Sequence, residues 1–296
     1  MSIQVTSTIL RKETVEHIGW AQRLGLFFLF LMCGVAVFVF GSNYYEIFPT
    51  NRNIYYNAVL SVVFLIVSLW LKRNERLTKY WQIPFAFFIA SFVILFTLLF
   101  DLSGSVLGWF NLTTSTSQGI AIAKLFDMVM IVVLIIVLTK LSGADLGSIY
   151  LKRGNLKWGL SIGAIVLFNF ASSAILFFAT RYTSIDKLIV AILWGVVFSF
   201  ANSFMEELWL SGIFLKRFEP LLGISGAVLV TSIVFSLMHV GAVYLTPAAI
   251  PFMLANTLTL GLACGYLMMK TDSIWGSTMI HAAADFFLFI AMLASV

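Results

Sequence analysis

The sequence predicts an all-α protein, a polytopic transmembrane bundle of about eight to nine helical spans, and two observations support that prediction. Hydrophobic residues make up 61% of the 296 positions and charged residues only 10%, with a mean hydropathy of +1.01. A water-soluble domain needs a charged surface, which this chain cannot supply. Apolar runs of about 18 or more residues recur along the chain, the length that crosses roughly 30 Å of hydrocarbon as a helix. The ten-residue alternation of a membrane β-barrel does not occur.

Nine apolar runs can be placed in order along the chain. The second run is short and can extend over polar Asn57, and the count falls to eight if one run is re-entrant. The polar stretch 101–119 is expected to be a loop. The predicted organisation is a cytoplasmic N-terminal segment over 1–23, a group of transmembrane helices over 24–180 and a core over 188–295. The predicted spans are 24–41, 57–71, 82–100, 119–139, 158–180, 188–214, 223–243, 248–269 and 273–295.

Lysine and arginine are distributed unevenly between the two sets of loops. If the N-terminus is inside, 14 of the 18 basic side chains fall in inner segments, three fall in outer ones and Lys124 lies within a span. The positive-inside tendency therefore places the N-terminus in the cytoplasm. The same bias accounts for the net charge of +5 without a nucleic-acid partner. The first apolar run lacks a persuasive small-residue cleavage site, so we expect a retained span in an integral membrane protein.

Five ionisable residues lie in three spans of the last third of the chain: Glu206 and Glu207 in SFMEELWLSGIF, then His239, His281 and Asp285. At the centre of a span such a residue costs about 2.5–3.5 kcal/mol on insertion scales, so it tends to face a cavity or a partner. His281 and Asp285 are four residues apart and project from one helix face. Glu206 and Glu207 point about 100° apart, so only one is expected to face a given site directly.

These residue types suit general acid–base chemistry in a site of low dielectric. A glutamate can act as general base on a water with one imidazole assisting, and a second imidazole positioned by Asp285 can donate to a developing oxyanion. Asn202, one turn before Glu206, can hydrogen-bond to it. The same groups could instead bind a divalent metal such as zinc, with Glu206, His239 and His281 as candidate ligands. No HExxH pattern occurs. Buried glutamates can also join helices or form a proton path.

In order along the chain, the Glu206–Glu207 pair, the FxxxH of Phe235–His239 and the HxxxD of His281–Asp285 resemble three motifs of one family. This is the CPBP family of intramembrane proteases (CAAX protease and bacteriocin-processing, or Abi), which includes the type II CAAX prenyl endopeptidases. The resemblance covers about residues 188–295. It implies a helical membrane fold in a bacterial or archaeal cell membrane and a peptide or membrane-protein substrate.

The resemblance also implies roles for the site residues. Water activation would fall to Glu206 with His239, and oxyanion support to His281 and Asp285, with Glu207 as a further candidate. Metal dependence in this family has been argued both ways. The family usually has an arginine four residues after the second glutamate, where this chain has Ser211. That departure keeps open a non-catalytic member that binds a partner or confers bacteriocin self-immunity. A proton-coupled transporter is a third reading, but we find no internal repeat that would support it.

Predicted depths in the membrane raise a difficulty for a shared site. At 1.5 Å per residue, Glu206 and His281 would lie about 15 Å and 12 Å from the inner end of their spans, and His239 about 24 Å. The three can meet only if the span 223–243 is strongly tilted, begins deep or starts as a re-entrant segment. The stretch Glu219–Gly223 is a candidate for such a break.

Overall fold

A computed structural model describes residues 19–42, 47–241 and 246–294 of the chain. These residues form an all-α structure in which nine helices are long and apolar enough to cross a membrane, which confirms the predicted fold class. Most of the predicted segment 1–23 lies outside the described residues. The main elements are α2 (Trp20–Gly34) continued by the π-helical turn η2 (Val35–Gly41), α3 (Thr50–Arg73), α4 (Gln82–Leu99), α5 (Leu102–Trp109), α6 (Ser117–Leu141), α7 (Leu156–Phe178), α8 (Ile185–Glu206) continued by the π-helical turn η6 (Glu207–Gly212), α9 (Leu215–His239), α10 (Ile250–Thr271) and α11 (Trp275–Leu293).

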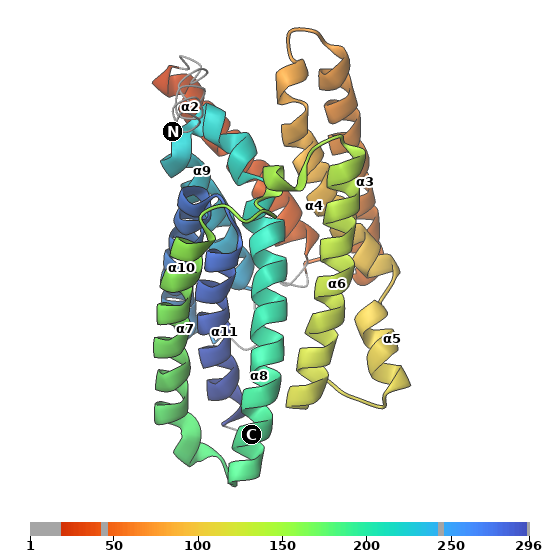
Figure 1. Cartoon of the computed structure of the whole chain (residues 1–296). Coiled ribbons are helices and arrows are strands. Elements are labelled where there is room, and N and C mark those ends of the chain that lie inside the picture. Colours follow the sequence, from red (N-terminus) through yellow and green to blue (C-terminus); the bar gives the residue numbers. More distant parts are fainter. Residues whose placement is uncertain (1–18, 43–46, 242–245, 295–296) are drawn as a thin grey trace.

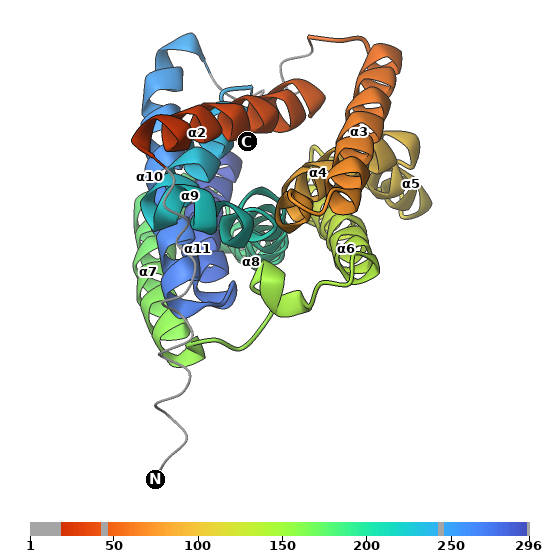
Figure 2. The same ribbon diagram turned by 90° about the horizontal axis from the view of Figure 1, so that it is seen from above.

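The helices form two groups, and α8 lies between them. Figure 1 shows α7, α8, α10 and α11 running side by side, with α3, α4, α5 and α6 on the other side of α8. Seen from above in Figure 2, α2 crosses over α9 and α10. Contacts between α8 and both α6 and α11 join the groups. The residues with the predicted site chemistry all belong to α8, η6, α9 and α11.

Two element predictions need correction. Helix α3 begins at Thr50, before the predicted limit of 57, because its polar side chains are buried against other elements: the Nδ2 of Asn57 donates to the carbonyl oxygen of Gly41 at 2.9 Å. The predicted loop 101–119 contains the helix α5. Its N-terminus is capped by Asp101, whose Oδ1 accepts from the backbone N–H of Gly104 at 2.9 Å. Such a side-chain oxygen satisfies one of the free donors of a first turn.

Helix α9 begins at Leu215, eight residues before the predicted start, and is broken within. Pro220 removes a backbone donor, and Gly223 has φ 71° and ψ 172°, a conformation that glycine adopts readily. The first part of α9 extends beyond the end of α8, and the second part returns beside α10 (Figure 1). The expected break in 219–223 is therefore present. Because of this break, the second part of α9 starts beyond the end of α8. His239, at the end of α9, therefore lies at the same level as Glu206.

Helices α7 and α11 approach each other closely through glycines. A Cβ added at Gly276 would lie 2.7 Å from both the Cα and the carbonyl oxygen of Gly159. One turn further along α7, a Cβ at Gly163 would lie 2.7 Å from the Cβ of Met279. Gly159 and Gly163 have the GxxxG spacing that lets two membrane helices pack backbone to backbone. This contact sets the position of α11, on which His281 and Asp285 lie.

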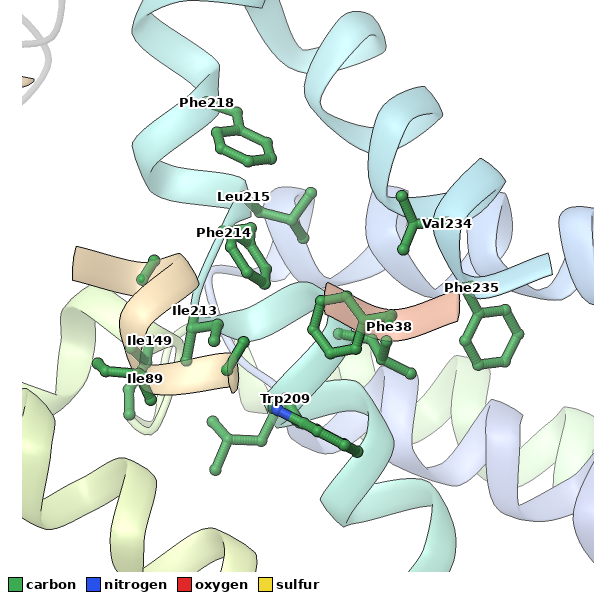
Figure 3. Packing of buried hydrophobic residues seen from close by; sticks show 14 of the residues in the cluster. Phe38, Ile89, Ile149, Trp209, Ile213, Phe214, Leu215, Phe218, Val234 and Phe235 are labelled. Atoms are coloured by element: carbon green, nitrogen blue, oxygen red, sulfur yellow. The ribbon is translucent and has the colours of Figure 1, made fainter. Parts of the chain in front are cut away.

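An aromatic core packs the two π-helical turns against each other. Figure 3 shows Phe38 of η2 beside Trp209 of η6, and their ring centroids are 5.2 Å apart in an edge-to-face arrangement. Phe38 also meets Phe214 at 5.9 Å. In η6 the backbone N–H of Ile213 bonds to the carbonyl of Leu208, five residues back. Such turns occur mostly singly and often at functional sites. Here the turn starts at Glu207.

An ion cluster joins three segments of the chain. Asp272, between α10 and α11, pairs with Lys152 and with Lys216 of α9, the latter at 2.6 Å. The Nζ of Lys216 also donates to the carbonyl oxygen of Gly147 at 2.6 Å. Partial burial opposes ionisation of Asp272, but its hydrogen bonds and charge attraction to the two lysines outweigh this and hold its pKa below the ordinary value. The hydrogen bond to Asp272 raises the pKa of Lys152.

Candidate active site

The fold brings all five predicted site residues together. Glu206 is the last residue of α8 and Glu207 the first of η6, His239 ends α9, and His281 and Asp285 lie one turn apart on α11. The Oε2 of Glu206 is 3.6 Å from the Nε2 of His239 and 3.7 Å from the Nε2 of His281. The depth difficulty is therefore resolved by the course of α9.

His281 lies between the carboxylates. Its Nδ1 is 2.9 Å from the Oε1 of Glu207, and its Nε2 is 3.7 Å from the Oδ1 of Asp285 as well as from Glu206. Glu206 faces both imidazoles, whereas Glu207 contacts only His281, at its other ring nitrogen. The two side chains do diverge from one backbone, but the imidazole presents a nitrogen to each of them. An ionised carboxylate only accepts hydrogen bonds, so this arrangement suits a ring that donates from both nitrogens.

His239 is oriented by its own helix. Its Nδ1 lies 2.8 Å from the carbonyl oxygen of Phe235, one turn earlier. A carbonyl accepts, so Nδ1 carries the proton and, in the neutral ring, Nε2 is left as an acceptor. That nitrogen faces Glu206. The FxxxH spacing thus fixes the tautomer of His239 through the backbone of Phe235.

The ring of Phe235 is a site component that the sequence analysis noted only as a motif position. Its centroid is 4.4 Å from the imidazole of His239 and 5.4 Å, edge-to-face, from that of His281. Figure 3 shows this ring at the edge of the aromatic core. Phe235 therefore separates the two imidazoles from the core and limits their rotation. The i, i+4 spacing to His239 was a signal for the first contact but gave none for the second.

Asn202 contacts a different carboxylate from the one expected. Its Nδ2 donates to the Oδ2 of Asp285 at 3.0 Å, joining α8 to α11, whereas the sequence suggested a bond to Glu206. Asn202 and Glu206 do share a helix face, but Asp285 approaches that face from α11 and takes the amide. No sequence spacing could show this contact, because it joins residues 83 positions apart.

The site is buried, and two of its acceptors remain open. Glu206 is 6% exposed, Glu207 3% and His281 1%. The Oε2 atoms of both glutamates are buried and accept no hydrogen bond from the described part of the chain. A buried carboxylate oxygen without a donor costs free energy. The Oε2 of Glu206 is the one that faces both histidines, so it is the atom available to a water or a substrate.

The residues as they lie do not form a metal site. Among the described residues, no group of three or more His, Cys, Asp or Glu side chains is arranged to hold a metal ion. Zinc needs ligand atoms at about 2.0–2.2 Å from the ion. In the candidate set of Glu206, His239 and His281, both nitrogens of His281 face carboxylates. A histidine that donates from Nδ1 to a carboxylate can bind a metal through Nε2, so the contact of His281 with Glu207 does not itself exclude a metal.

Ser211, where the resemblance calls for an arginine, is 7% exposed and makes no side-chain hydrogen bond within the described chain. No arginine or lysine forms an ion pair with Glu206, Glu207 or Asp285 among the described residues. Three carboxylates thus face two imidazoles. Protonation of a histidine would supply the only positive charge among these five side chains.

Comparison with known proteins supports the resemblance. The family model described as type II CAAX prenyl endopeptidase Rce1-like matches residues 188–287. This confirms the similarity predicted from the three motifs, all of which lie in the matched segment. The match covers about a third of the chain. No curated protein and no solved structure matches the chain.

Proposed function

We propose that this chain, whose residues 188–287 match the type II CAAX prenyl endopeptidase Rce1-like family, is an intramembrane endopeptidase. In this proposal Glu206 and His239 activate a water that cleaves a peptide or protein substrate within the membrane. One observation carries the proposal above the others. A buried carboxylate oxygen without a hydrogen-bond donor, Oε2 of Glu206, lies within 3.7 Å of a nitrogen on each of two imidazoles.

Glu206 is the general base. Its Oε2 and the Nε2 of His239 are both acceptors and face each other across 3.6 Å. A water beside them can donate one proton to each, which turns its lone pairs toward a substrate carbonyl. General bases must lie within hydrogen-bond reach of the proton they remove, directly or through one water. As the water attacks, its proton passes to Glu206 and is then available to the leaving amine.

His281 stabilises the negative charge that forms on the substrate carbonyl oxygen. A carboxylate oxygen faces each of its two ring nitrogens. In its protonated form His281 is therefore a donor, held in place by Glu207 on one side and Asp285 on the other. A pre-oriented donor in a site of low dielectric is worth more than one in water, since it does not reorganise during the reaction. Glu207 therefore acts through His281.

The substrate reaches this site from the membrane or its inner surface. The match to a CAAX prenyl endopeptidase family makes a membrane-attached peptide or protein the expected class. Lys152 and Lys216, which pair with Asp272, belong to segments that the positive-inside tendency predicts to be cytoplasmic, which supports an orientation with the N-terminus inside. The proposed location is a cell membrane, with the N-terminus in the cytoplasm.

Hydrolysis in ¹⁸O-labelled water tests the reaction type. Purified chain in nanodiscs would be incubated with a library of lipidated and unlipidated peptides, and products identified by mass spectrometry. We expect a new C-terminus carrying one ¹⁸O atom from solvent, because water is the attacking group. Products without solvent oxygen would contradict water attack.

A non-catalytic role is the alternative, and Ser211 is the observation that favours it. Without the usual arginine, the three carboxylates have no fixed cation within the described residues, so a partner protein could supply it. This alternative would be favoured by capture of a partner with no cleavage of it, together with a cellular phenotype that survives Glu206→Gln.

A further inference from the structure

We infer that Asn202 is a positioning residue of the site. It holds Asp285 so that one oxygen of the carboxylate faces His281. The effect on catalysis rests on the function proposed above, whereas the effect on His281 follows from the contacts alone.

The contacts form a continuous chain. The Nδ2 of Asn202 donates to the Oδ2 of Asp285 at 3.0 Å, and the Oδ1 of Asp285 lies 3.7 Å from the Nε2 of His281. That same nitrogen is 3.7 Å from Glu206. Asn202 is therefore two contacts away from the nitrogen that faces the general base.

Asn202 is the only hydrogen-bond donor to the Asp285 side chain in the described part of the chain. It is itself 7% exposed. An ionised carboxylate has no donor, so it must meet the amide at its NH₂ group. This hydrogen bond fixes the Oδ2 of Asp285 against α8, and the Oδ1 faces His281. Loss of the Asn202 amide would leave the Oδ2 of Asp285 without a donor and the carboxylate free to rotate.

The direction of the hydrogen bond decides which atom His281 meets. In Asp285→Asn the charge that faces His281 is lost, but Asn202 can flip and accept from the new NH₂ group, so an oxygen can still face the imidazole. In Asn202→Asp two carboxylates meet across the 3.0 Å that a hydrogen bond now spans. In the double variant Asn202→Asp/Asp285→Asn the bond reverses, and an oxygen faces His281 again.

These variants distinguish a positioning role of Asn202 from a role in helix packing alone. If the contact only joined α8 to α11, Asn202→Ala would lower the melting temperature and leave kcat and the environment of His281 unchanged. If Asn202 positions Asp285 toward His281, Asn202→Ala and Asn202→Asp lose function, and the double variant regains what Asn202→Asp loses.

The kinetic test uses Asn202→Ala, Asn202→Asp, Asp285→Asn and the double variant. Asn256→Ala is the matched control, since Asn256 is an exposed amide on α10 that bonds only to its own helix. We expect Asn202→Ala and Asn202→Asp each to lower kcat by about 10- to 100-fold, as loss of an orienting partner typically does, with KM unchanged, and Asp285→Asn to have a smaller effect. The double variant should recover at least about tenfold over Asn202→Asp, and Asn256→Ala should match wild type.

A spectroscopic test works without turnover. The chain has three histidines, so ¹⁵N-histidine NMR spectra can be assigned with His17→Ala and His239→Ala. We expect the Nε2 resonance of His281 to move in Asn202→Ala and in Asn202→Asp, and to return toward wild type in the double variant.

Two results would overturn the inference. One is wild-type kcat and an unmoved His281 resonance in Asn202→Ala. The other is a double variant no better than Asn202→Asp when both melt at the wild-type temperature. If the wild type cleaves no peptide, the proposed function fails, and the NMR result alone decides the role of Asn202.

Discussion

His281 is the side chain through which the carboxylates of the site meet. Glu207 contacts one of its nitrogens, and Glu206 and Asp285 the other. His239 has a different partner set, a backbone carbonyl and Glu206. The two imidazoles are therefore not equivalent. His239 presents an acceptor to the site and His281 a donor, which is the division of roles that water attack on a carbonyl requires.

Glu207 supports His281, so a conservative change there should be milder than one at Glu206. Glu207→Gln keeps an oxygen that accepts from the Nδ1 of His281, and we expect kcat/KM to fall by about tenfold. The measurement is steady-state cleavage of one peptide by purified variants. A loss in Glu207→Gln as large as that in Glu206→Gln would show that Glu207 takes part in proton transfer.

At the residue scale the sequence predicted the five polar residues as one set, because each is expensive in a membrane. It could not show how they pair. The pairing depends on the position of His281 between two helices. Asn202 of α8 donates a hydrogen bond to Asp285 of α11. Those contacts join residues far apart in the chain.

Close packing of α7 on α11 is the feature of the elements that places His281 and Asp285. A methyl group at Gly276 would collide with backbone atoms of Gly159, which cannot move aside as a side chain tip can. We expect Gly276→Ala to destabilise the fold by about 1–3 kcal/mol, the usual cost of overpacking, and to reduce turnover by shifting α11. Thermal melting in detergent and peptide cleavage would measure the two effects.

Gly25→Ala is the control for that substitution, since a Cβ at Gly25 in α2 meets no atom within 4 Å. It should melt at the wild-type temperature or slightly higher. Equal melting of Gly276→Ala and wild type would contradict the close contact.

The Asp272 cluster links the α10–α11 turn to α9 and to the segment before α7. Since the pKa of Asp272 is lowered in the fold, its stabilisation is present above its ordinary pKa and disappears as pH falls through the lower folded value. Lys152 has a raised pKa, so its share is lost only as pH rises through that higher value. We expect Asp272→Asn to lower the melting temperature at pH 7 and to match wild type near pH 2. A difference that persisted at pH 2 would contradict the ion pairs.

Element boundaries show where sequence reasoning reached its limit. Apolar run lengths predicted nine spans, and the structure has nine helices of spanning length in its described residues. The early start of α3 was missed because buried asparagine and serine look polar in a sequence. The π-helical turns were not predictable either, since no residue type marks them. The GxxxG spacing of Gly159 and Gly163 is in the sequence and could have predicted the α7–α11 contact.

At the scale of the whole molecule, the orientation in the membrane stays a prediction from charge. Lys152 and Lys216, the partners of Asp272, both lie in segments that the charge bias predicts to be inner. We expect a membrane-impermeant thiol reagent applied to intact cells to label Ser115→Cys and not Arg153→Cys. The native Cys264 is buried and Cys33 partly buried, so background labelling should be low. The reverse pattern would invert the proposed topology.

The two helix groups also differ in what they contribute. All five site residues come from α8 and the elements after it, which is also the part that the family match covers. The group α3 to α6 supplies no site residue and packs against α8, η6 and α9. Within the part of the chain from α8 onward, the proposed chemistry depends on a single atom, the Oε2 of Glu206.

The most direct test of that claim is the single-turnover rate of Glu206→Gln on a peptide that the wild type cleaves. Glutamine keeps the size of the side chain and removes its basicity, so the rate should fall by about 10²- to 10⁴-fold. Glu75→Gln, the same change at an exposed position, should cleave at the wild-type rate. Melting temperatures of both variants should equal that of the wild type. Equal rates for Glu206→Gln and the wild type would contradict the mechanism.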